Sequence, residues 1–130
     1  MTLRPICLIA LSGLLGVFSA GNTKAIAQEI SGQPYESQLI QLAETLGSLH
    51  YLSNLCGDTT SLWRDQMNTL LTTEKADANR RKNLVSSFNN SYQTYADNYN
   101  QCTDQALKAI ERFKIQGEKL SEALIAHYGN

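Results

Sequence analysis

Apolar residues recur at steps of three and four along four segments of the chain, which is the spacing of one face of a helix. The first segment follows Pro34, a residue that suits the first turn of a helix. Gly57 stands where a left-handed C-cap would end that helix. The apolar stripe between them comprises Leu39, Leu42, Leu46, Leu49, Leu52 and Cys56. We therefore predict one long helix from Pro34 to Gly57.

A second, shorter helix is predicted after this glycine. Asp58, Thr59 or Thr60 can cap its N-terminus, and its pattern ends near Glu74. Its apolar face comprises Trp63, Met67, Leu70 and Leu71. The stretch from Thr72 to Ala78 has no apolar periodicity, and we predict that it forms a loop.

Two longer helices follow this loop. Asp77 is the predicted N-cap of the third helix, whose stripe changes from aliphatic to tyrosine along its length: Leu84, Phe88, Tyr92, Tyr95, Tyr99 and Cys102. Thr103 and Asp104 are suited to cap the fourth helix, which continues to Tyr128 and ends at Gly129. The apolar stripe of the fourth helix comprises Leu107, Ile110, Phe113 or Lys114, Gly117, Leu120 and Leu124.

These segments predict an all-α protein, a small antiparallel bundle of about four helices closed by one disulfide. Short loops favour an up-down-up-down order, which places Cys56 and Cys102 at the same end of the bundle. A square bundle would hold those two helices on a diagonal, too far apart for a disulfide. We therefore expect the first, third and fourth helices to form the main core. The second helix would pack to one side, anchored by Trp63.

The N-terminal residues have the features of an export signal. Arg4 gives a positive start, Ile6–Ala20 is an uncharged apolar run, and Ala25–Ala27 suits signal peptidase. The alternative is a membrane anchor, since Pro5–Thr23 approaches the roughly 20 residues that a span needs. Proline, three glycines and three hydroxyl residues shorten the apolar part of that run. We predict a signal peptide at residues 1–27, a flexible lead-in at 28–34, and one helical domain at 35–130 of a periplasmic protein.

Cleavage after Ala27 would remove Cys7 and leave two cysteines, Cys56 and Cys102. An even pair in an oxidising compartment favours a disulfide. The alternative is two buried free thiols. Neither cysteine has a C-x-x-C partner, so the spacing gives no support for metal or haem binding.

Charge and motifs argue against several function classes. Without Arg4 and Lys24 the acidic residues outnumber the basic ones, which disfavours nucleic-acid binding and polybasic membrane binding. We also expect no stable membrane insertion after signal cleavage. His50 and His127 are not spaced as zinc ligands, and no G-x-S-x-G motif supports a hydrolase. We therefore expect neither an enzyme nor a metal or other cofactor.

Several polar and aromatic side chains could contact a partner. Tyrosines interleaved with asparagines combine rigid rings with adaptable hydrogen bonds, although the same rings also complete a core stripe. The Arg80–Lys82 cluster is either a solvated helix start or a patch for an acidic partner or an anionic envelope polymer. His50 is either packed or partner-facing, and Trp63 is either a core anchor or part of a contact with Arg64. The candidate partner-binding residues are His50, Trp63, Arg64, Arg80, Arg81, Tyr92, Tyr95 and Tyr99.

The runs Leu49–Gly57, Leu62–Met67 and Cys102-Thr103 resemble a family of small secreted alphaproteobacterial proteins of unknown function. The resemblance covers nearly the whole predicted mature chain. It implies a periplasmic location, a paired Cys56 and Cys102, and no established catalytic activity. It also implies a link to activation of a peptidoglycan amidase. Phe113 stands where a tyrosine would be expected, a departure that affects only packing.

The functional prediction is a non-enzymatic periplasmic protein-binding module. Its concrete form is a regulator of a cell-wall hydrolase, engaged near Trp63 and Arg64 or through the tyrosine and asparagine face of the third helix. The alternative is a glycan or small-molecule binding protein that uses a groove lined by Tyr92, Tyr95 and Tyr99.

Overall fold

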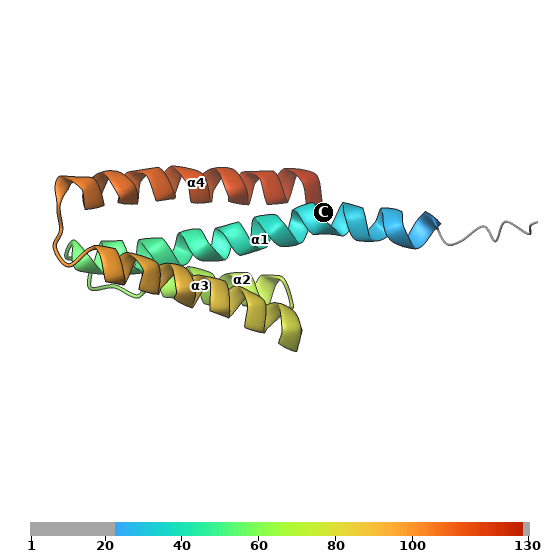
Figure 1. The fold of residues 1–130 in the computed structure, drawn as a ribbon, viewed down its shortest axis with the longest axis horizontal. Coiled ribbons are helices and arrows are strands. Elements are labelled where there is room, and N and C mark those ends of the chain that lie inside the picture. Colours follow the sequence, from blue (N-terminus) through green and yellow to red (C-terminus); the bar gives the residue numbers. More distant parts are fainter. Residues whose placement is uncertain (1–22, 129–130) are drawn as a thin grey trace, which may run out of the picture.

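The computed structural model describes residues 23–128, and their side chains from residue 34 onward. It contains four helices: α1 (Thr23–Leu55), α2 (Leu62–Thr73), α3 (Ala78–Asn98) and α4 (Asp104–Tyr128) (Figure 1). No strand occurs within these residues, so the predicted all-α class is confirmed. The predicted signal peptide lies largely outside the described residues, as does the predicted helix end at Gly129. None of the four helices is long and apolar enough to cross a membrane.

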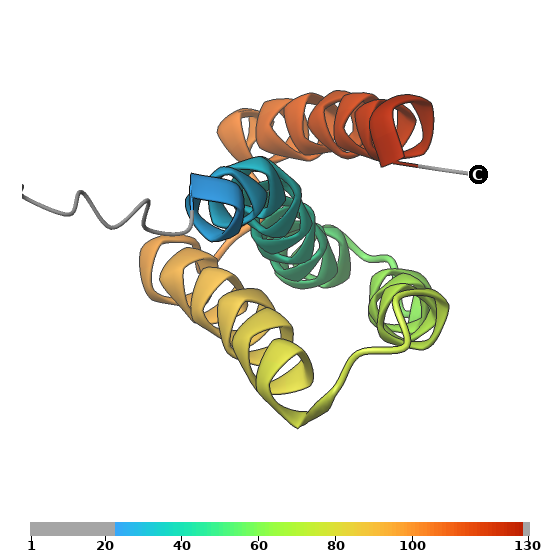
Figure 2. The ribbon, with the colours of Figure 1, turned by 90° about the vertical axis from the view of Figure 1, so that its right-hand side faces the viewer.

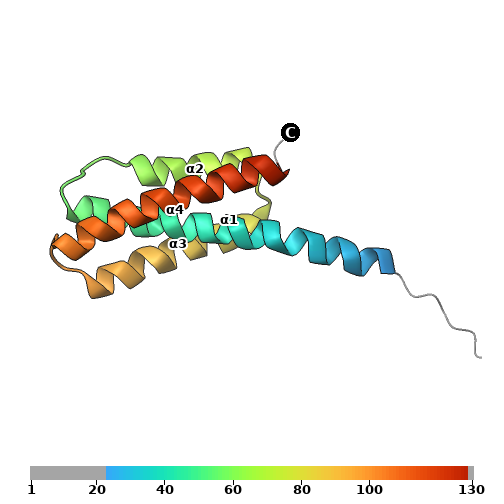
Figure 3. The ribbon, with the colours of Figure 1, turned by 90° about the horizontal axis from the view of Figure 1, so that it is seen from above.

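The central element of the bundle is α1, against which each of the other helices packs. Viewed along its length, α1 lies in the middle, with α2 and α3 on one side and α4 on the other (Figure 2). The four helices alternate in direction, and α1 extends beyond the others at its N-terminal end (Figure 3). Because α1 and α3 are adjacent helices, they do not occupy the diagonal positions of a square bundle, and the two cysteines can approach each other.

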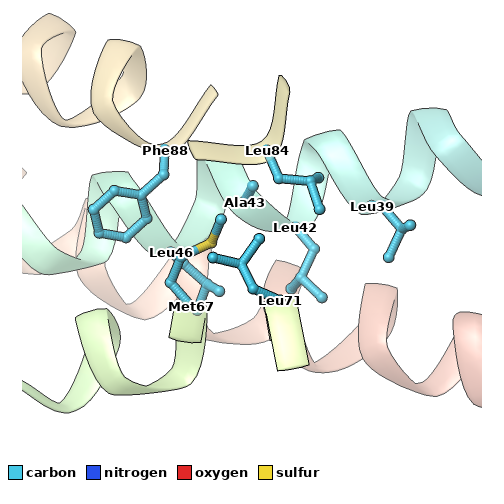
Figure 4. Packing of buried hydrophobic residues seen from close by; sticks show 8 residues of the cluster. All are labelled: Leu39, Leu42, Ala43, Leu46, Met67, Leu71, Leu84 and Phe88. Carbon is cyan, nitrogen blue, oxygen red and sulfur yellow. The ribbon is translucent and has the colours of Figure 1, made fainter. Parts of the chain in front are cut away.

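Two apolar clusters hold the helices to α1. The larger cluster joins α1, α2 and α3 (Figure 4), and its buried members are Leu39, Leu42, Ala43, Leu46, Met67, Leu71, Leu84 and Phe88. The smaller joins α1 to α4 through Leu49, Leu52, Ala106, Ala109 and Ile110. The expectation that α2 would lie outside the main core is therefore incomplete, since Met67 and Leu71 are part of it.

The two ends of α1 differ in how closely they match the prediction. The helix begins at Thr23 and contains Pro34, whereas a start at Pro34 was predicted. That prediction was wrong because it relied on the apolar stripe, which begins only at Leu39. At the other end, Gly57 adopts φ +98°. The Gly57 N–H donates to the Asn54 carbonyl and the Asp58 N–H donates to the Ser53 carbonyl. This is a Schellman motif, so the predicted glycine cap is confirmed.

The remaining helix ends follow the predicted caps in part. Asp77 accepts a hydrogen bond from the Arg80 N–H at 2.8 Å, and Thr103 accepts one from the Ala106 N–H at 3.1 Å. The N-cap of α2 is Ser61, whereas Asp58, Thr59 or Thr60 was expected. The third helix ends before Tyr99, which has an extended backbone. Tyr99 and Cys102 therefore belong to the α3–α4 loop and not to the helix.

Glycine allows α1 to approach its neighbours closely. A Cβ on Gly47 would lie 2.9 Å from the Phe88 carbonyl carbon of α3, and closer still to its oxygen. One residue further along α1, the hydroxyl oxygens of Ser48 and Ser91 are 2.6 Å apart. The α1–α3 contact at this level is thus built on small residues.

Candidate functional site

The disulfide lies at the end of the bundle where α1 stops and α4 begins. The Cα atoms of Cys56 and Cys102 are 4.9 Å apart, so the predicted pairing is confirmed. A hydrogen bond from the Tyr51 hydroxyl to the Tyr99 carbonyl ties the same loop to α1. Together they fix the start of α4 to the end of α1.

His50 lies in the interior between α1, α2 and α3. Its side chain is 5% exposed, and its ring centroid lies 5.8 Å from that of Phe88 and 5.6 Å from that of Tyr92. Burial and then the Arg64 guanidinium lower the pKa of His50, against the opposing charge of Asp65. The imidazole is therefore neutral near pH 7, with Nε2 3.4 Å from the Arg64 guanidinium. Of the two alternatives, the structure places His50 in a packed position.

The three tyrosines of the predicted face separate into two groups. Tyr92 meets Tyr51 edge to face, with ring centroids 5.3 Å apart, on the side of His50. Tyr95 stacks with Tyr99 at 5.9 Å and meets Phe113 of α4 edge to face at 5.3 Å. All three are half-buried. They therefore pack at the helix boundaries instead of forming one continuous exposed face.

Arg80 is held at the opposite end of the bundle. Its guanidinium pairs with Glu36 of α1, lies 3.9 Å from the Glu74 carboxylate, and sits 5.9 Å from the Tyr35 ring centre. The Tyr35 hydroxyl also donates to Glu74. These side chains join α1 to the α2–α3 loop. Arg81, the next residue of the basic cluster, is exposed.

The Tyr35 hydroxyl should make stability depend on pH in the alkaline range. Burial, and then the hydrogen bond to Glu74, raise the pKa of Tyr35 to about 12. Because this pKa is higher in the folded than in the unfolded state, the protonated hydroxyl stabilises the fold. This stabilisation is complete below the ordinary pKa near 10 and is lost as pH rises through about 12. In Tyr35→Phe this loss should be absent. Urea unfolding of the wild type and of Tyr35→Phe at about pH 9 and about pH 11.5 tests this. An equal loss of unfolding free energy between the two pH values in both proteins would contradict it.

A polar groove runs between α3 and α4 over the α1 backbone, and we call it the α3–α4 groove. It encloses about 350 Å³. Its only charged lining residue is Glu44, and two aromatic rings, Tyr95 and Phe113, close one end. The other lining residues carry hydroxyl or amide groups: Thr45, Ser48, Ser87, Asn90, Ser91, Thr94 and Gln116.

A second groove separates α2 from α4, and we call it the α2–α4 groove. It comprises two cavities of about 340 and 310 Å³, one towards the disulfide end and one towards the C-terminal half of α4. Three exposed aliphatic side chains line it: Leu62, Leu107 and Ile125, which are 45%, 49% and 71% exposed. Trp63 lies in its wall and donates a hydrogen bond from Nε1 to Ser53 Oγ at 3.0 Å.

The sequence prediction missed part of this groove. Leu107 was expected in the core stripe of α4, but it faces the groove, because α2 does not pack against α4. Neither Leu62 nor Ile125 was among the candidate partner-binding residues. Each lies beside an apolar stripe, so spacing alone gave no signal of exposure. Within residues 34–128, no cluster of three or more histidine, cysteine or acidic side chains could hold a metal ion.

The fold and its grooves define a disulfide-closed helical protein with two open grooves, one on each side of α4. The chain belongs to the family described as protein of unknown function (DUF2385), whose model matches residues 34–128. The resemblance to a family of unknown function is thereby confirmed. Comparison with curated proteins and with solved structures gave no significant match.

Proposed function

We propose that this protein is a non-enzymatic periplasmic module that binds a helix of another protein in its α2–α4 groove. The observation that carries the proposal is the exposure of Leu62, Leu107 and Ile125 along one groove. Large apolar side chains gathered at an open site mark an interaction surface. Two helical walls with the buried Leu42 and Leu46 between them suit an amphipathic helix, which is a common recognition mode.

The anchoring of the groove walls supports this proposal. One wall is α2, held by Met67 and Leu71 in the core, and the other is α4, held by Ala106, Ala109 and Ile110. The disulfide fixes the start of α4. A groove whose walls are already in place binds with less loss of conformational entropy than a flexible one.

The more specific proposal is that the partner is a cell-wall hydrolase and that the protein regulates or activates it. The predicted export signal would bring the chain into the periplasm, and the resemblance described above includes a link to a peptidoglycan amidase. Trp63, which was a predicted contact residue, lies in the groove wall. The proposal thus retains the predicted α2 surface and adds α4 to it.

Photo-crosslinking from inside the groove tests this function. A photoreactive amino acid in place of Leu107 should form an adduct with a cell-wall hydrolase in intact cells, and Leu107→Glu should abolish co-purification of that hydrolase. The same photoreactive group in place of Asn89, an exposed residue of α3, serves as the control. Identical adducts from both positions, or adducts that lack any cell-wall hydrolase, would refute the proposal.

A second candidate function is glycan binding in the α3–α4 groove. Hydroxyl and amide groups beside the rings of Tyr95 and Phe113 form a lining that could bind a sugar, since neutral hydrogen-bonding groups fix orientation within a pocket. Tyr95 is the one predicted tyrosine that lines this groove.

Thermal unfolding with purified peptidoglycan fragments tests the glycan alternative. The fragments should raise the melting temperature of the wild type by a few degrees, as mass action requires for a ligand of the folded state. Asn90→Ala and Tyr95→Ala, each compared with its own ligand-free form, should lose this increase. Asn89→Ala, an exposed change outside the groove, should retain it. An unchanged melting temperature of the wild type would reject this candidate.

A further inference from the structure

Opposite charges separate along the two flanks of α4. Three acidic residues, Glu111, Glu118 and Glu122, follow one another at steps of seven and four, which keeps them on one flank of a helix. Three basic residues follow at steps of four and seven on the other flank: Lys108, Arg112 and Lys119. All six are exposed. The helix therefore presents an acidic flank and a basic flank.

The acidic flank borders the α2–α4 groove. Glu111 lines this groove together with Leu107, and Asp58 lines it from the α1–α2 loop. Hydrogen bonds from the Thr60 hydroxyl and N–H lower the pKa of Asp58, which is therefore ionised at neutral pH. The one basic residue that lines the groove, Lys114, is paired with Glu111 at 3.2 Å. With Glu111 and Lys114 paired, Asp58 leaves the lining of the groove with one excess negative charge.

The basic flank faces the other way. Arg112 and Lys119 line a shallow depression together with Ile115 and Gln116. Gln116 also lines the α3–α4 groove, so this depression lies on the α3 side of α4. A ligand in the α2–α4 groove would therefore meet the carboxylates of α4 and, of its cations, only Lys114, which is paired with Glu111.

We propose that the occupant of the α2–α4 groove is an amphipathic helix whose apolar face is bordered by lysine or arginine. This inference rests on the proposed function and specifies its partner. The apolar face would cover Leu62, Leu107 and Ile125, and the bordering cations would lie opposite Glu118 and Glu122 on the acidic flank. Complementary charge of this kind selects among partners and sets their orientation. Leu107 and Ile125 are 18 residues apart on α4, which is about 27 Å along the helix, so an occupant that covers both needs about five turns.

Trp63 provides the reporter for the test, because it is the only tryptophan of the chain and lies in the groove wall. Two helical peptides without tryptophan or tyrosine share one leucine and alanine face and differ only in their flanks, which carry lysine in one and glutamate in the other. Titration of the protein with the lysine peptide should change Trp63 emission. The lysine peptide should bind about three- to tenfold more tightly than the glutamate peptide, as expected for a few exposed ion pairs.

Charge reversal on α4 gives the matched control. Glu118→Lys combined with Glu122→Lys leaves the Glu111–Lys114 pair intact and should remove or invert the preference for the lysine peptide. Lys108→Glu combined with Lys119→Glu changes the opposite flank and should leave the preference as in the wild type. Equal binding of both peptides would overturn the charge assignment while the groove remained a helix-binding site. No response to either peptide would also overturn it, and crosslinking from Leu107 would then judge the proposed function separately.

Discussion

Replacement of Gly47 by alanine is expected to lower the free energy of unfolding by about 3 kcal/mol, at the upper end of the range for overpacked cores. The added Cβ would overlap the Phe88 carbonyl group of α3. The obstacle is backbone, so no side-chain rotation relieves it, and α1 and α3 would have to move apart. Separation of the helices would disturb Leu84 and Phe88 in the larger core cluster. Urea unfolding monitored by circular dichroism measures this loss.

Gly117→Ala is the matched control on α4. There the nearest atom to an added Cβ is Cγ2 of Thr45 at 3.4 Å, a side-chain atom at ordinary contact distance. Alanine favours a helix over glycine by up to about 1 kcal/mol, so this variant should be neutral or more stable than the wild type. Equal destabilisation by both substitutions would show that the α1–α3 approach is not the cause.

Removal of the disulfide should have an effect of similar size. Cys56 and Cys102 are 46 residues apart in sequence, and closing a loop of this length stabilises a fold by about 4 kcal/mol on the chain-entropy model. Small domains have total stabilities of only about 5–15 kcal/mol. Replacement of both cysteines by serine should therefore lower the urea midpoint strongly. The α4 helix should loosen first, because its backbone approaches only α1 closely and its contact with α3 is limited to side chains such as Phe113 against Tyr95.

Reductant provides the control for this prediction. Dithiothreitol should lower the stability of the wild type to that of the double serine variant and should have no effect on the variant itself. A wild type that unfolds at the same urea concentration with and without reductant would contradict the assigned contribution of the disulfide.

Apolar spacing predicted the four helices because α2, α3 and α4 each bury one apolar stripe against α1, and α1 buries its own stripe against them. The caps at Gly57, Asp77 and Thr103 were also predictable, because capping depends on residues close in sequence. The N-terminal extent of α1 was not, because the stripe begins only at Leu39. The need for glycine at position 47 could not be predicted, because it arises from the Phe88 carbonyl of α3, which is distant in sequence.

The candidate site was predictable only in part. The disulfide pairing followed from two cysteines and an export signal. Arg80 was expected as a solvated residue or a docking residue, but Glu36 and Glu74 hold it in the bundle, and Glu36 is 44 residues away in sequence. Leu107 lies at the edge of the α4 stripe, where burial depends on whether another helix covers it. Because α2 and α4 leave a groove between them, this edge residue is part of the proposed binding surface.

The central claim is that a partner helix occupies the α2–α4 groove, and methyl NMR tests it most directly. Ile125 and Ile115 are both exposed on α4, at 71% and 53%, but only Ile125 lines the groove. When the partner segment identified by crosslinking is added, the methyl signals of Ile125, Leu62 and Leu107 should shift, and that of Ile115 should stay in place. Shifts centred on Ile115, or none at the three groove residues, would contradict the claim.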